Sequence, residues 1–142
     1  MRVSRSFAAV VGVVGLVAGG CGPRVMPDPP KTYLVKGKIL LPNRQPLSGG
    51  RLTFTPRSDK PSALEGFAEI EPDGSFKASL FTENGGLPPG IWLVTISPHS
   101  QYGGIPRTVH ANQIPKKFME ENFTPWTIEV KNQDVEQNLV LN

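Results

Sequence analysis

The sequence is poor in the residue types that build reactive centres. Its 142 residues include one cysteine, Cys21, and two histidines, His99 and His110. A single cysteine excludes an intramolecular disulfide. A zinc site needs three or four well-placed ligands, and neither histidine is followed by a glutamate three positions later. Because nucleophile turns of the Gly-x-Ser-x-Gly type and phosphate-binding glycine loops are also missing, we predict no catalytic residue, no metal and no cofactor.

The chain also lacks a strong excess of charge. It has 15 basic and 12 acidic residues, which gives a formal net charge of +3. Arg2 and Arg5 precede an apolar run, and without these two the balance is 13 basic against 12 acidic residues, or +1. No cluster of lysine and arginine remains, and the aromatic residues do not form a stacking pattern. We therefore expect no nucleic-acid partner.

The only long apolar run lies at the start of the chain. Residues 7–20 (FAAVVGVVGLVAGG) are uncharged and follow the two arginines. This run is shorter than the roughly 20 apolar residues of a permanent membrane-spanning helix. A positive start, a short apolar run and small residues at its end are typical of a cleaved signal peptide. We predict a signal peptide at residues 1–20.

Cys21 follows this run directly, and residues 17–21 (VAGGC) resemble a bacterial lipobox. The resemblance implies cleavage between Gly20 and Cys21, and lipidation of Cys21. Ala18 departs from the family, which usually has leucine there. Gly22 is not the aspartate that commonly retains such proteins at the inner membrane, so the resemblance favours an extracytoplasmic protein anchored to the outer membrane. The alternative for Cys21 is a buried free cysteine that acts as a small apolar residue.

Prolines and glycines number 15 each, which predicts many turns between short elements. Four of the prolines lie in residues 22–32 (GPRVMPDPPKT), and proline holds a chain extended. We expect residues 21–32 to be a lipidated linker and residues 33–142 to form one all-β domain.

Seven short runs in that domain alternate apolar and polar residues, the pattern of half-buried strands. They are residues 33–41, 51–55, 66–71, 76–80, 91–97, 126–131 and 135–141. Asp73-Gly74 between two such runs predicts a hairpin. The fifth run is apolar on both faces in its first half, which predicts a central strand covered on both sides. The predicted core consists of Val35, Ile39, Leu52, Phe54, Ile70, Phe76, Leu80, Trp92, Val94, Ile96, Ile128, Val130 and Leu139.

Five motifs in this order resemble carboxypeptidase-regulatory-like domains, which are prealbumin-like (transthyretin-like) sandwiches. The motifs are residues 35–39 (VKGKI), 46–50 (PLSGG), 52–56 (LTFTP), 73–76 (DGSF) and 89–96 (PGIWLVTI). The resemblance implies a seven-stranded Greek-key β-sandwich and an accessory or surface module. Gly49, Gly50, Gly74 and Gly90 occupy turn positions where a positive φ is expected.

Residues 98–125 are too long for an ordinary loop, and such segments tend to be functional or disordered. We expect residues 115–122 to form a helical turn or two. Of the aromatic residues, Phe118 and Phe123 are expected to pack on the open end of the sandwich. Tyr102, beside two glycines, is expected to be the residue most available for contact. Tyr102, His99 and His110 thus form the candidate binding loop.

Two classes of function remain. The first is a non-catalytic envelope lipoprotein that is held to the membrane by its lipid and either has a structural role or binds an envelope protein or glycan, as a monomer. The alternative is an extracytoplasmic hydrolase that uses His99 or His110 with a nearby serine or carboxylate. Exposed histidines favour the first class, and a buried, hydrogen-bonded pair in a pocket favours the second.

Overall fold

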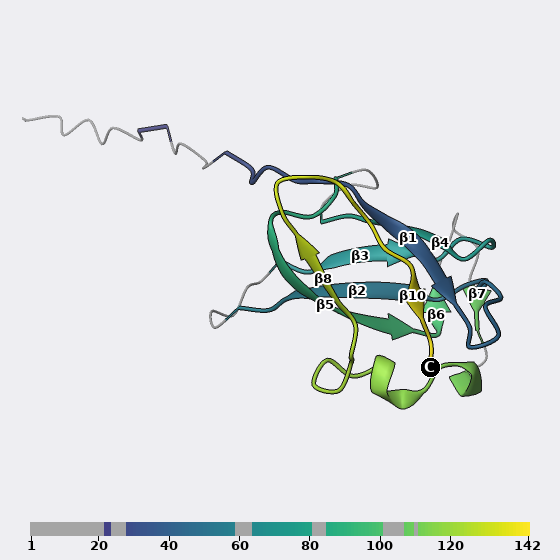
Figure 1. Ribbon diagram of the computed structural model, residues 1–142. Coiled ribbons are helices and arrows are strands. Elements are labelled where there is room, and N and C mark those ends of the chain that lie inside the picture. The colour runs from purple at the N-terminus through teal and green to yellow at the C-terminus, as the bar shows by residue number, and fades with distance from the viewer. Residues whose placement is uncertain (1–21, 24–27, 59–63, 81–84, 101–106, 110) are drawn as a thin grey trace, which may run out of the picture.

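The computed structural model describes residues 22–23, 28–58, 64–80, 85–100, 107–109 and 111–142. These residues form an all-β fold with two main sheets and one short two-stranded sheet (Figure 1). Within them, no helix is long and apolar enough to cross a membrane.

The first sheet has the order β10-β1-β4, and β9 also pairs with β1. Strand β1 (Val35–Leu40) lies antiparallel to β4 (Ser75–Ala78). On its other side it pairs in parallel with β9 (Val135–Glu136) and then with β10 (Leu139–Val140). The last two strands therefore run along one edge of β1 and are interrupted at residues 137 and 138.

The second sheet is antiparallel throughout, with the order β3-β2-β5-β8. Its strands are β2 (Arg51–Pro56), β3 (Gly66–Glu69), β5 (Gly90–Ser97) and β8 (Thr127–Val130). A small hairpin of β6 (His99–Ser100) and β7 (Arg107–Thr108) follows β5. Two single-turn 3-10 helices, η2 (Ala111–Gln113) and η3 (Lys116–Phe118), precede β8.

The alternating pattern of the sequence correctly predicts which side chains the two sheets bury. In β1 the inward residues Val35 and Ile39 are fully buried, whereas Lys36 and Lys38 face outward. All thirteen predicted core residues belong to one buried cluster that both sheets share. The predicted turn glycines at 49, 50, 74 and 90 all have positive φ.

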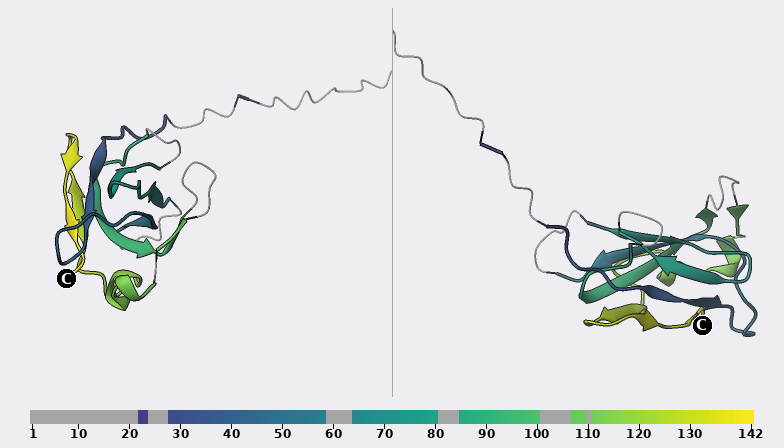
Figure 2. Two further views of the ribbon diagram at one scale, coloured as in Figure 1. Left: turned by 90° about the vertical axis from the view of Figure 1, so that its right-hand side faces the viewer. Right: turned by 90° about the horizontal axis from the view of Figure 1, so that it is seen from above.

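The turn at Asp73-Gly74 forms as predicted, but it makes a corner between the sheets rather than a simple hairpin. Gly74 has a φ of 82°, which a residue with a side chain rarely adopts. Before the turn, β3 pairs with β2, and after it β4 pairs with β1, so the two strands belong to different sheets. A bridge joins Phe67 of β3 to Ser79, which directly follows β4, and their backbones exchange two hydrogen bonds. This bridge joins the two sheets on this side, and Figure 2 gives two further views of the sheets.

The opposite side of the core is filled by aromatic side chains. The ring of Phe118 in η3 lies 4.4 Å from that of Trp126, centroid to centroid. The Trp126 indole N–H donates to the Val140 carbonyl of the first sheet, although Trp126 itself precedes β8 of the second. The buried Thr124 hydroxyl donates to the Val94 carbonyl and accepts from the backbone N–H of Trp126. The segment before β8 therefore links the two sheets where no strand joins them.

Two of our expectations for side-chain burial are wrong. Phe123 does not pack on the sandwich but is 66% exposed, because the turn that follows η3 brings back Thr124, not Phe123, as its buried residue. Strand β5 is central, as predicted, but it is not covered on both faces. Ile91 is 44% exposed and Leu93 is half-buried, since no element of the described chain lies over the outer face of the second sheet at these positions. The helical turn predicted at residues 115–122 reduces to the 3-10 turn η3.

Candidate functional site

Most of the site residues predicted from the sequence lie outside the described residues. This applies to Gly20 and Cys21 at the expected cleavage site, and to Tyr102 and His110 in the candidate binding loop. Of these predictions, only His99 lies in an element of the structure. It begins β6 as an exposed residue, and its backbone N–H donates to the Ser97 hydroxyl at 3.4 Å. The hydrolase hypothesis, which uses His99 or His110 with a nearby serine or carboxylate, therefore stays a prediction.

In the described part of the chain, no group of three or more histidine, cysteine, aspartate or glutamate side chains is placed to hold a metal ion. The surface of the described residues contains a hollow rich in charged groups. It lies on the outer face of the first sheet and has a volume of about 270 Å³. We call this hollow the lysine depression. It is lined by Lys36, Gly37, Lys38, Glu71, Ser75, Phe76, Lys77, Glu136 and Asn138.

Strand alternation and register bring the three lysines together. Side chains at every second position of a strand share one face, so Lys36 and Lys38 both project outward from β1. In the antiparallel register of β1 and β4, Lys77 is directly opposite Lys36, and Ser75 is directly opposite Lys38. On the other side of β1, Glu136 of β9 is the register partner of Lys36. A row of Lys77, Lys36 and Glu136 thus crosses the sheet.

Two of the lysines make ion pairs at the rim of the depression. Lys36 Nζ lies 3.4 Å from a Glu136 carboxylate oxygen, and Lys38 Nζ lies 3.8 Å from one of Asp73. All four side chains are about half exposed or more, and exposed ion pairs contribute little to stability, typically 0 to about 1 kcal/mol each. These pairs therefore orient the lysine side chains more than they stabilise the fold.

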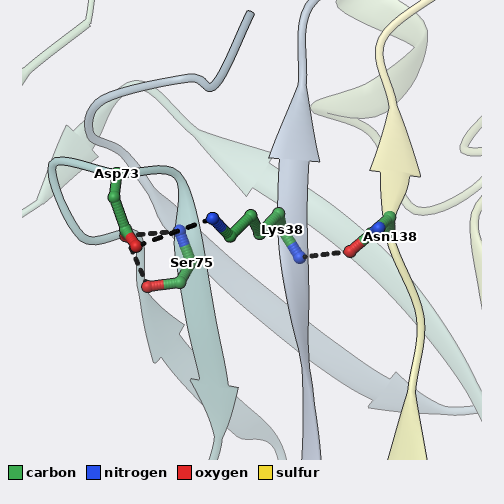
Figure 3. A network of polar contacts seen from close by, with 4 residues as sticks. All are labelled: Lys38, Asp73, Ser75 and Asn138. Carbon is green, nitrogen blue, oxygen red and sulfur yellow. Dashed lines mark hydrogen bonds and ion pairs between the residues drawn. The ribbon is translucent and has the colours of Figure 1, made fainter. Parts of the chain in front are cut away.

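The turn beside the depression holds a small polar network (Figure 3). One Asp73 oxygen accepts hydrogen bonds from the Ser75 hydroxyl at 2.5 Å and from the Ser75 backbone N–H at 2.9 Å. The other Asp73 oxygen faces Lys38. The Ser75 hydroxyl and backbone N–H, with the Lys38 charge as a smaller contribution, hold the pKa of the Asp73 carboxyl below its usual value of 3.8.

This lowered pKa predicts a pH dependence of stability. A carboxyl with a lowered folded-state pKa contributes stability above its unfolded value, and that contribution is lost as the pH falls through the folded value. We expect the urea midpoint of the wild-type protein to fall more steeply below about pH 4 than that of Asp73→Asn. Asp28→Asn, an exposed change outside the sheets, should keep the wild-type slope. Parallel slopes for wild type and Asp73→Asn would contradict the role of this network.

Asparagine and aspartate side chains complete the other edge of β1. The Asn138 carbonyl oxygen accepts from the Lys38 backbone N–H at 3.0 Å, and Asp134 accepts from the Leu34 N–H at 2.9 Å. Asn138 takes the place of a backbone acceptor where the last strand is interrupted, and Asp134 does so directly before β9 begins. Asn138 is thereby fixed at the rim of the depression (Figure 3).

The alternation of apolar and polar residues in the run 33–41 predicts that Lys36 and Lys38 face outward, but it does not reveal the depression itself. Lys77 is separated from them by about 40 residues, and only the register of β1 with β4 reveals that it is their neighbour. The strand pattern of the sequence does contain one usable signal, because Lys77 alternates with the buried residues Phe76 and Ala78.

Comparison with models of known protein families found no match, and comparisons with curated proteins and with solved structures found none either.

Proposed function

We propose that this chain is a bacterial lipoprotein, held outside the cytoplasm by lipid on Cys21, whose β domain is a non-catalytic binding or structural module of the cell envelope. The observation that carries the proposal is the order of segments. A positively charged start and a short apolar run lead to the only cysteine, then to a proline-rich segment, and then to the first strand.

The structure supports a linker between the lipid and the domain. Residues 28–31 are exposed and belong to no strand or helix. The first pairing with the body of the fold is at Tyr33, whose backbone exchanges two hydrogen bonds with Leu87. If residues 22–32 are extended, at about 3.1 Å per residue, they span roughly 30 Å. The domain would then stand clear of the membrane surface.

The strand order also supports the finer assignment of a seven-stranded, prealbumin-like sandwich. Strands β9 and β10 pair with the same strand in the same direction and are naturally counted as one interrupted strand. The first sheet then has three strands and the second has four. The family-like motif at residues 46–50 immediately precedes β2, and the motif at residues 73–76 runs from the turn into β4. A module of this kind fits an accessory role, although fold alone does not settle function.

Replacing Cys21 with serine tests the proposal. Serine has no thiol to form the thioether, so the variant is expected to lose the lipid label. Two or three acyl chains anchor far more durably than one, at about 0.8 kcal/mol per buried CH₂, so the variant should be either a soluble protein or an unprocessed precursor that keeps residues 1–20. The measurements are labelling with a radioactive fatty acid and detergent phase partitioning of cell fractions.

Met26→Ala, a change in the same segment that keeps the cysteine, is the matched control and should behave as the wild type does. Unchanged partitioning and labelling of Cys21→Ser would defeat the proposal.

A further inference from the structure

The lysine depression contains a pair of like charges that the fold leaves uncompensated on one side. Lys77 is the direct cross-strand neighbour of Lys36, and like charges in this position repel. The carboxylate of Glu136 lies on the far side of Lys36, on β9. Among the described residues, Lys77 has no ion pair of its own. An anionic group held between Lys36 and Lys77 would offset this repulsion.

The other groups in the depression can form hydrogen bonds of both kinds. Glu71 and Glu136 bring carboxylate oxygens, which accept. Asn138 uses its carbonyl oxygen for the Lys38 N–H, which leaves its amide N–H groups as donors. Ammonium, amide and carboxylate groups side by side suit a ligand that has many hydroxyl groups as well as a negative charge.

The size and charge of the depression favour a small ligand over an extended anionic surface. Its volume of about 270 Å³ is just below the range of roughly 300 to 1,000 Å³ for small-molecule sites. Three lysines and two glutamates give its lining a net charge of +1, and the Asp73 carboxylate lies beside Lys38 at its rim. Attraction to an anionic membrane grows with each basic residue near the surface, so carboxylates among the lysines weaken it. A lining of +1 matches a single carboxylate better than a doubly charged phosphate monoester.

We propose that the lysine depression binds a saccharide that carries a carboxylate, with Lys36 and Lys77 holding the carboxylate. Glu136 and Glu71 accept hydrogen bonds from sugar hydroxyls, and Asn138 donates one. This proposal rests on the proposed function, since it names the ligand class of the envelope module.

The experiment uses the full chain in detergent and isothermal titration with galacturonate, which carries a single carboxylate and whose methyl ester is the neutral counterpart. We expect the wild type to bind the acid, and Lys77→Gln to weaken binding at least about tenfold. We also expect Lys77→Arg to restore binding, and Lys131→Gln, which removes a lysine at the end of β8, to leave it unchanged. Because the repulsion with Lys36 disappears, Lys77→Gln should keep or slightly raise the thermal midpoint.

Equal binding of acid and ester, no binding of the acid, or unchanged binding by Lys77→Gln would overturn the proposal. Binding to phosphatidylglycerol vesicles that Lys77→Gln abolishes, without binding of galacturonate, would overturn it in favour of a membrane contact. These outcomes are independent of the Cys21→Ser fractionation, so the ligand can be wrong while the lipoprotein assignment holds, and the reverse.

Discussion

Replacing Phe76 with alanine is expected to lower the free energy of unfolding by about 3 to 5 kcal/mol, the usual cost of truncating a large core side chain. Phe76 is 1% exposed, and its ring lies 6.1 Å from that of Phe54 in the facing sheet. Removing it leaves a cavity between the two sheets that neighbouring side chains fill only in part. Urea unfolding followed by circular dichroism, with a strand-dominated spectrum, measures the loss.

Phe123→Ala is the matched control, because it deletes the same side chain at a position that is 66% exposed. Surface substitutions usually change stability by less than about 0.5 kcal/mol. Similar losses for the two variants would contradict the burial of Phe76, and so would a helical spectrum of the wild-type protein.

The core was predictable because period-two alternation fixes which side chains of a strand share a face. Val35 and Ile39 alternate with two lysines, so their burial follows from the pattern alone. Burial in the irregular segment had no such constraint. Phe118 and Phe123 are both loop aromatics, yet the first is fully buried and the second is exposed. Which of them packs depends on how η3 and the following turn direct the chain.

The candidate site depends on the pairing register between strands that are far apart in the chain. The alternation of apolar and polar residues does not predict this register. Lys36 and Lys77 become neighbours only when β1 and β4 pair with Val35 opposite Ala78. The parallel strand at the other edge adds Glu136 and Asn138 to the site. The sequence also does not predict that this parallel strand is interrupted, because residues 135–141 form a single alternating run. The interruption begins at Gln137, which faces Gly37 of the neighbouring strand.

Gly37 lies where the backbone of the last strand comes close to β1. An ideal Cβ on this residue would lie 1.8 Å from the Gln137 carbonyl oxygen and 3.1 Å from the Phe76 ring. Contacts below 3.0 Å to backbone atoms require the backbone to move. Gln137 follows β9, and its N–H donates to the Lys36 carbonyl at 2.9 Å. A side chain at position 37 would therefore separate the interrupted strand from β1.

We expect Gly37→Ala to destabilise the protein by about 3 kcal/mol, at the upper end of the cost of overpacking, despite adding a single methyl group. The displaced strand would also carry Asn138 and Glu136 away from the lysine depression, so hydrogen exchange at the Lys38 N–H, which donates to Asn138, should accelerate. Urea unfolding measures the first effect and amide exchange the second. Gly22→Ala is the control, because a Cβ there meets nothing within 4 Å and stability should not change. If Gly37→Ala proved as stable as Gly22→Ala, the close approach of Gln137 to β1 would be wrong.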